Sequence, residues 1–189
     1  ARAGCHEALF TLGERPEDRY EVAAEWLAEH SYASTVDYLA AMCRLVLEET
    51  GLLPHANAGA LDRADLATLR AVSASQGMMV ESLDPTLECH RGAPDKAPER
   101  RLATLEAAGE LAIPFTTGIL VGIGETATEV VDSLFALRRL ADSTGAIQEV
   151  IIQNFRAKAD TLMRRSAEPV PRWFAVVVTY SGLPSACAT

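Results

Sequence analysis

The chain has 189 residues, of which 49% are hydrophobic, and 17 basic against 26 acidic residues give a formal net charge of −9. This length allows one sizeable core, the acidic balance argues against nucleic acid as a partner, and no apolar run approaches the roughly 20 residues that cross a bilayer. The cysteines lack the close spacing of a zinc or redox motif, which predicts reduced thiols in a cytoplasmic protein. They are Cys5, Cys43, Cys89 and Cys187.

Strand-like and helical patterns alternate along most of the chain. In chain order they predict a strand over Glu7–Leu12, helices over Glu17–His30 and Ser34–Thr50, a strand over Leu52–Asn57, a helix over Asp62–Ser73, a strand over Gly77–Leu83, a helix over Glu99–Gly109, a strand over Ile113–Val121, a helix over Thr128–Ala141 and a strand over Ile147–Asn154. Such alternation predicts an α/β fold with a parallel sheet, either an open doubly wound sheet or a barrel.

Residues 164–189 do not continue this alternation. They include a run of β-formers, Trp173–Tyr180, but no helical period. We therefore expect a domain over residues 1–163 and a divergent tail over 164–189, either irregular or forming a short edge strand.

Polar residues lie at the carboxyl ends of all five predicted strands or directly after them. They are Gly13 and Glu14, His55 and Asn57, Glu81 and Ser82, Gly122 to Glu125, and Gln153 and Asn154. Since the carboxyl ends of parallel strands carry the chemistry of α/β folds, these residues favour a barrel with one shared mouth.

The most specific segment is Gly118–Thr126, which predicts a buried strand, a glycine turn and a helix start. Thr126 and Glu129 have the spacing of a capping box. The helix terminus and the side-chain-free backbone offer a ligand a close approach. A tight turn without a ligand explains the same residues.

Two ligand motifs overlap in this segment. The first is the dinucleotide fingerprint, formed by Gly122, Gly124 and Ala127 with Asp142 further on. It would make the chain a nicotinamide- or flavin-binding oxidoreductase. The second is Gly-x-Ile-x-Gly-x-x-Glu, by which radical enzymes hold the adenine of S-adenosylmethionine; it is approximated by Gly118, Leu120, Gly122 and Glu125.

Other candidates are single side chains, each with a plainer explanation as a solvated or structural residue. Glu14 could accept hydrogen bonds from an ammonium group, and Glu81 could hold a ribose hydroxyl. Weaker candidates for substrate contact are His55, Asn57, Asp95, Lys96, Thr116 and Thr117.

Several strings, in the same order, resemble the radical S-adenosylmethionine FO synthases. They are residues 4–17, 53–57, 75–83, 93–96, 113–126 and 148–155, and the resemblance covers roughly Gly4 to Met163. It implies an incomplete parallel (β/α) barrel of the radical S-adenosylmethionine type, lacking the first strand and the cluster loop.

The resemblance also implies an activity. The family's cyclising half is a lyase of coenzyme F420 biosynthesis that converts 5-amino-5-(4-hydroxybenzyl)-6-(D-ribitylimino)-5,6-dihydrouracil to 7,8-didemethyl-8-hydroxy-5-deazariboflavin and releases ammonia. In that family a reduced [4Fe–4S] cluster cleaves S-adenosylmethionine, and the resulting radical abstracts hydrogen from the adduct. The implied partner is the activity that makes the tyrosine adduct, as a fused domain or a separate protein.

Carried over by position, the resemblance assigns a cofactor site. Gly13 and Glu14 would meet the methionine amino group, Glu81 and Ser82 the ribose, and Gly118, Gly122 and Glu125 the adenine, while Asn154 would close the site.

The chain departs from the family in one decisive respect. The family's Cys-x-x-x-Cys-x-x-Cys motif does not occur in it. We therefore expect the metal ligands to lie before Ala1, and the chain alone to be inactive. A noncatalytic truncated remnant remains an alternative.

Overall fold

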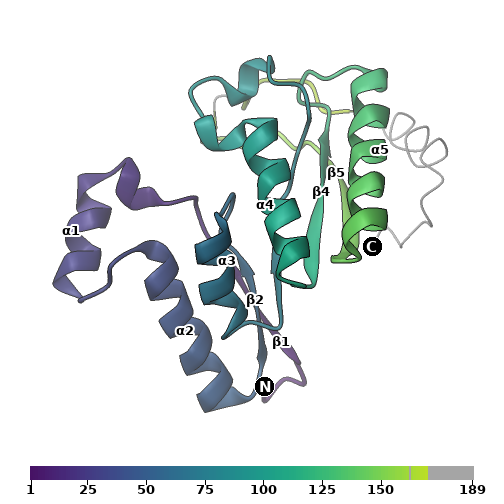
Figure 1. Ribbon diagram of the computed structural model, residues 1–189. Coiled ribbons are helices and arrows are strands. Elements are labelled where there is room, and N and C mark those ends of the chain that lie inside the picture. Colours follow the sequence, from purple (N-terminus) through teal and green to yellow (C-terminus); the bar gives the residue numbers. More distant parts are fainter. Residues whose placement is uncertain (162, 170–189) are drawn as a thin grey trace.

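A computed structural model describes residues 1–161 and 163–169 of the chain. Its centre is a parallel sheet whose strands follow one another in chain order (Figure 1). The strands are β1 (Glu7–Thr11), β2 (Leu53–Asn57), β3 (Ser75–Gly77), β4 (Phe115–Val121) and β5 (Ile147–Asn154). Because this order never reverses, the sheet has no switch point of the doubly wound kind, and the barrel topology holds.

Helices connect successive strands. They are α1 (Glu21–Glu29), α2 (Thr35–Thr50), α3 (Arg63–Arg70), α4 (Pro98–Glu110) and α5 (Ala127–Thr144), with the short 3-10 turns η1 (Pro16–Asp18), η2 (Glu88–His90) and η3 (Pro94–Lys96). Right-handed crossovers between neighbouring parallel strands place their helices on one face of the sheet. Accordingly, α2 to α5 share a single hydrophobic cluster with β2, β4 and the segment after β3.

Strand alternation assigns each side chain to a face. Ala56 packs against the helices, so His55 and Asn57 point to the opposite face of β2. On β4, Phe115 and Ile119 pack against the helices. The face of the sheet opposite the helices therefore carries His55 and Asn57, toward the carboxyl end of β2.

Local sequence explains the helix boundaries. The Ser34 hydroxyl accepts a hydrogen bond from the Asp37 N–H at the start of α2, and Asp62 caps α3. The capping box predicted for Thr126 and Glu129 is confirmed at the start of α5. Each cap satisfies backbone donors that a helix terminus otherwise leaves free.

Two predicted elements are wrong in detail. The strand predicted over Gly77–Leu83 lies earlier, over Ser75–Gly77, and further along an isolated bridge joins Glu81 to Ile119 of β4. Within the apolar run Met78–Val80, Met78 and Val80 are buried although the run is not part of a strand. An apolar run of this kind therefore indicates burial, and it does not by itself indicate a strand.

The helix predicted over Glu17–His30 is split into η1 and α1. Tyr20 has an extended backbone between them, with φ −129° and ψ 112°. In the predicted tail, residues 164–169 form turns and irregular backbone, and Trp173–Tyr180 lie outside the described residues. The division at residue 163 stays a prediction.

Candidate functional site

A cavity of about 410 Å³ opens near the carboxyl ends of β1, β2 and β3. Among its lining residues are several that the sequence singles out: Gly13, Glu14, Asn57, Glu81, Asp95 and Lys96. The cavity lies where catalytic and binding residues gather in barrels.

Glu14 follows β1 and lies directly against Gly59. A Cβ at Gly59 would come within 1.7 Å of the Glu14 Cγ, so only glycine leaves room for this carboxylate. One oxygen, Oε1, accepts a hydrogen bond of 2.5 Å from Arg101 Nη2, whereas the buried Oε2 has no hydrogen-bond partner among the described residues. Glu14 therefore has one oxygen fixed and one still in need of a partner.

The pKa of Glu14 is raised. Burial is the main cause and the nearby Asp95 carboxyl adds to it, against the opposing effects of the Arg101 charge and the Ala60 N–H. A cation that meets Oε2 would offset the cost of burying this carboxylate, and an ammonium group fits that need.

Glu81 is held rigidly after β3. Its backbone N–H donates to the Gly118 carbonyl (3.0 Å), its own carbonyl accepts from Leu120 N–H (2.9 Å), and its φ is +67°. Such a backbone angle is uncommon for a residue other than glycine and persists only when its surroundings enforce it. The two bonds to β4 supply that enforcement.

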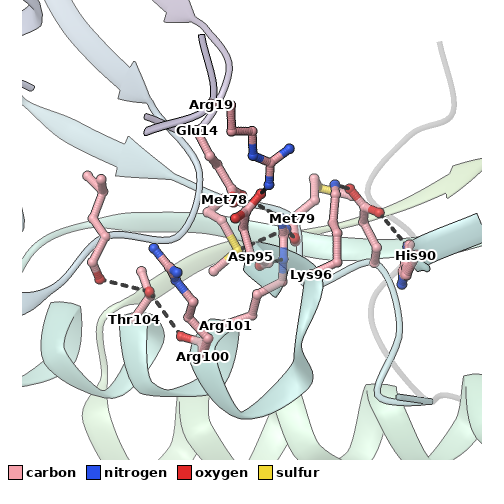
Figure 2. A network of polar contacts seen from close by, with 12 residues as sticks. Glu14, Arg19, Met78, Met79, His90, Asp95, Lys96, Arg100, Arg101 and Thr104 are labelled. Carbon is pink, nitrogen blue, oxygen red and sulfur yellow. Dashed lines mark hydrogen bonds and ion pairs between the residues drawn. The ribbon is translucent and has the colours of Figure 1, made fainter. Parts of the chain in front are cut away.

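The Glu81 carboxylate is an acceptor for two basic side chains. Lys96 Nζ bonds to Oε1, and His90 Nε2 lies 3.0 Å from Oε2 (Figure 2). Burial by itself raises the pKa of Glu81, but the His90 hydrogen bond and the Lys96 charge outweigh it and lower the pKa to about 2. Glu81 is therefore ionised over the whole physiological range.

Arg101, Arg19 and His90 belong to this network, although sequence reasoning missed all three. Arg19 pairs with Asp95, and Arg101 reaches from α4 to Glu14 (Figure 2). A signal for Arg101 exists in the sequence. It shares one helix face with Leu105 and Ala108 at spacings of four and three, and all three are buried.

The glycine turn after β4 is closed by its own carboxylate. Glu125 accepts hydrogen bonds from the Gly122 N–H (2.6 Å) and the Ile123 N–H (2.8 Å). These are donors that a bound pyrophosphate would need. Asp142, the acid of the dinucleotide motif, is 3.8 Å from Arg138 on α5, with 74% of its side chain exposed. The geometry does not favour a dinucleotide here.

Other predicted site residues do not line the cavity. Gly118 is packed so closely that a Cβ would lie 2.0 Å from the Ile151 carbonyl oxygen, and Ser82 Oγ accepts from the Asp84 N–H (3.1 Å). Asn154 ends β5 opposite Val121, and its Oδ1 is buried without a hydrogen-bond partner among the described residues.

The weaker substrate candidates are dispersed. His55 Nδ1 lies 2.7 Å from Ser75 Oγ, and burial lowers the pKa of His55. Thr116 accepts a hydrogen bond from Gln148 Nε2 (3.3 Å), and Thr117 is fully buried on the face of β4 that packs against the helices. Only Asn57, Asp95 and Lys96 of this group reach the cavity.

Thiols are scattered. Cys5 is exposed, Cys43 is buried, and Cys89 is half-buried. Burial raises the pKa of the Cys43 thiol to about 11. Within residues 1–161 and 163–169, no three His, Cys, Asp or Glu side chains are grouped to hold a metal ion, so the described residues do not fit an iron–sulfur cluster.

None of the helices in the described part of the chain has the length and apolar character of a membrane span.

The described residues do fit S-adenosylmethionine. Four buried side-chain atoms lack a hydrogen-bond partner in this part of the chain, and two of them, Glu14 Oε2 and Asn154 Oδ1, belong to residues predicted to hold the cofactor. Unpartnered buried polar atoms are rare in native proteins, and a polar ligand is one way to satisfy them.

The fold matches known barrels. The chain superposes on the FeFe-hydrogenase maturase HydG from Carboxydothermus hydrogenoformans with a TM-score of 0.73 and 19% identity, covering 93% of this chain and 39% of that one. For methylornithine synthase PylB the TM-score is 0.69 at 21% identity, with 95% and 48% covered. The predicted fold class, an α/β fold with an incomplete parallel (β/α) barrel, is confirmed.

Sequence similarity identifies the relatives within that class. The chain is 56% identical to FO synthase of Nocardia farcinica, over 87% of the chain and 20% of the relative. It is 50% identical to 7,8-didemethyl-8-hydroxy-5-deazariboflavin synthase of Methanopyrus kandleri, over 89% of the chain and 52% of the relative. The predicted resemblance to the FO synthases is therefore confirmed.

The chain spans about a fifth to a half of the length of these curated relatives. No protein-family model matches it. The alternative of a nicotinamide- or flavin-binding oxidoreductase receives no support from these relatives.

Proposed function

We propose that this chain forms the S-adenosylmethionine-binding part of an FO synthase. The enzyme would close the tyrosine–ribityl-aminouracil adduct into the deazaflavin, with release of ammonia. The observation that carries this is the cavity that brings Glu14 and Glu81 together in a chain at least 50% identical to such synthases over most of its length.

Glu14 and Glu81 would hold opposite parts of the cofactor. The free Oε2 of Glu14 is suited to the ammonium group of the methionine moiety, with Gly13 beside it. Glu81 is a rigid, permanently ionised acceptor, which suits the hydroxyls of a ribose. Asp95 and Lys96 complete the charged wall of the cavity.

The adenine would lie beyond this cavity, toward the ends of β4 and β5. Gly118 lies within β4, and Gly122 and Glu125 belong to the turn that follows it. Ser82 lies next to Glu81, and Asn154 offers a buried Oδ1 that has no hydrogen-bond partner among the described residues. Because Glu125 already occupies the turn's donors, this wall suits an uncharged ring better than a phosphate.

The remaining assignments follow the same proposal. His55, Asn57, Thr116 and Thr117 stay candidates for the side of the site that meets the adduct. Bound S-adenosylmethionine, together with a reduced [4Fe–4S] cluster, would supply hydrogen-atom abstraction, and the protein would orient it and exclude water. The cluster ligands and the adduct-forming partner would come from outside this chain, in the cytoplasm.

Binding of S-adenosylhomocysteine to the 189-residue chain tests the proposal. We expect saturable binding in calorimetry that Glu14→Gln weakens by about 10- to 100-fold, since a charge-assisted hydrogen bond is lost. Glu48→Gln is the matched control, because Glu48 is exposed on α2. Absence of binding, or equal affinity in both variants, would contradict the assignment.

A further inference from the structure

Arg101 is among the least exposed charged residues of the fold. It lies on α4 and is only 2% exposed, yet its guanidinium reaches the cavity. A buried guanidinium is costly unless its donors are used, so its contacts indicate why it is there.

The N–H groups of the Arg101 guanidinium donate hydrogen bonds to several segments of the chain. Nη2 donates to Glu14 Oε1 (2.5 Å), and Nε donates to the Asp95 carbonyl (3.0 Å). Nη1 donates to the Met79 carbonyl and lies 3.3 Å from Met78 Sδ (Figure 2). Arg101 thus connects the loop after β1, the segment after β3 and η3.

This arrangement restricts Glu14 from two sides. Gly59 leaves room for the side chain on one side, and the Arg101 fork fixes Oε1 on the other. With Oε1 bonded to Arg101 and Cγ packed against Gly59, few orientations of the carboxylate remain, and the range open to Oε2 is narrow. The guanidinium fork is itself rigid, so little freedom remains in the pair.

We propose that Arg101 is the positioning residue of this cavity: it acts through Glu14, setting the carboxylate that meets the cationic group of the ligand. The ligand's identity rests on the proposed function, but the positioning of Glu14 by Arg101 does not. The neighbouring Arg100 provides a matched comparison, since it is exposed on the same helix.

The first measurement is the titration of Glu14 in the ligand-free chain, followed by carboxyl-carbon NMR. The charged groups that face Glu14 are Arg101 from α4 and Asp95 from η3. Because the Arg101 charge lowers the pKa of Glu14, Arg101→Met should raise it further. Arg100→Met should shift the pKa of Glu14 less, because the Arg100 charge acts on Asp95. Loss of the positive charge alone would also raise this pKa, so Arg101→Lys, which keeps the charge, is the variant that separates positioning from charge.

The second measurement is the affinity for S-adenosylhomocysteine. Arg101→Met should weaken it by about 10- to 100-fold, as expected when the bond that orients a charged acceptor is lost. Arg101→Lys keeps the charge but not the fork, so it should bind more weakly than the native chain and more tightly than Arg101→Met.

Each outcome decides one claim. A folded Arg101→Met variant with native titration of Glu14 overturns the positioning role. If that variant does not fold, Arg101→Lys decides instead: native titration and native affinity would both speak against positioning. If the native chain binds no S-adenosylhomocysteine, the proposed function is wrong. The titration of Glu14 still decides whether Arg101 positions it.

Discussion

Gly59 and Glu14 are in such close contact that the first has no room for a side chain. A Cβ at Gly59 would lie 1.7 Å from the Glu14 Cγ and 2.6 Å from Oε1, and Gly59 has a φ of +80°. Gly59, in the loop after β2, therefore helps to determine the position of the Glu14 carboxylate after β1.

Replacing Gly59 with alanine should displace Glu14 and weaken the binding of S-adenosylhomocysteine by at least the factor expected for Glu14→Gln. Gly51→Ala is the control, because Gly51 has a similar φ of +69° and no atom near the added Cβ. Both variants should lose about 1–2 kcal/mol of stability from the left-handed backbone, measured by urea unfolding. Native affinity in Gly59→Ala would show that Glu14 does not depend on this contact.

Glu81 should make the stability of the chain depend on acid. Its pKa of about 2 lies below the ordinary 4.5, so its ionised form stabilises the fold above pH 4.5, and this contribution is lost as the pH falls toward 2. The contribution is on the order of 3 kcal/mol. We expect Glu81→Gln to lose stability at pH 7 and to show a flatter decline between pH 4.5 and 2.

Urea unfolding at pH 7 and pH 3 checks this, with Glu48→Gln as the control. Equal acid sensitivity in Glu81→Gln and the native chain would mean that His90 and Lys96 do not hold Glu81 as described.

Glu125 should contribute more to the stability of the fold than its neighbour Glu129. Glu125→Ala leaves the N–H groups of Gly122 and Ile123 without their acceptor, at a cost of about 1.5–3 kcal/mol for bonds to a charged group. Glu129→Gln keeps the capping box, because glutamine also fits it, and should change stability by less than about 0.5 kcal/mol. Comparable unfolding midpoints for the two variants would argue against the role of Glu125.

The chain should not bind an iron–sulfur cluster by itself. No suitable group of ligands occurs in residues 1–161 and 163–169, and a [4Fe–4S] cluster requires several thiolates close together. Anaerobic reconstitution with iron and sulfide should leave the visible absorbance near baseline. A stoichiometric cluster with its own spectrum would refute the expectation that the ligands lie outside the chain.

Local signals in the sequence predicted the scaffold well. The caps at Ser34 and Thr126 and the apolar periods fix where helices start and which way they face, so the parallel order of strands follows. Glu14 and Glu81 could be singled out because a carboxylate at a strand end is conspicuous, and both lie in the cavity.

Long-range pairings were beyond the sequence. Nothing near Arg101 in the chain reveals that it meets Glu14, and nothing near His90 reveals that it meets Glu81. The short β3 was missed because the buried Gln76 is polar. Its Nε2 is satisfied by the Leu66 carbonyl, a partner ten residues away that no periodicity shows.

The bond between Glu14 and Arg101 joins residues that are 87 positions apart. During synthesis, Glu14 emerges long before its partner, and the cavity cannot exist until α4 has docked against the sheet. The binding site therefore cannot be complete before α4 is made, and a nascent chain that ends before Arg101 carries the acid without the cation that orients it.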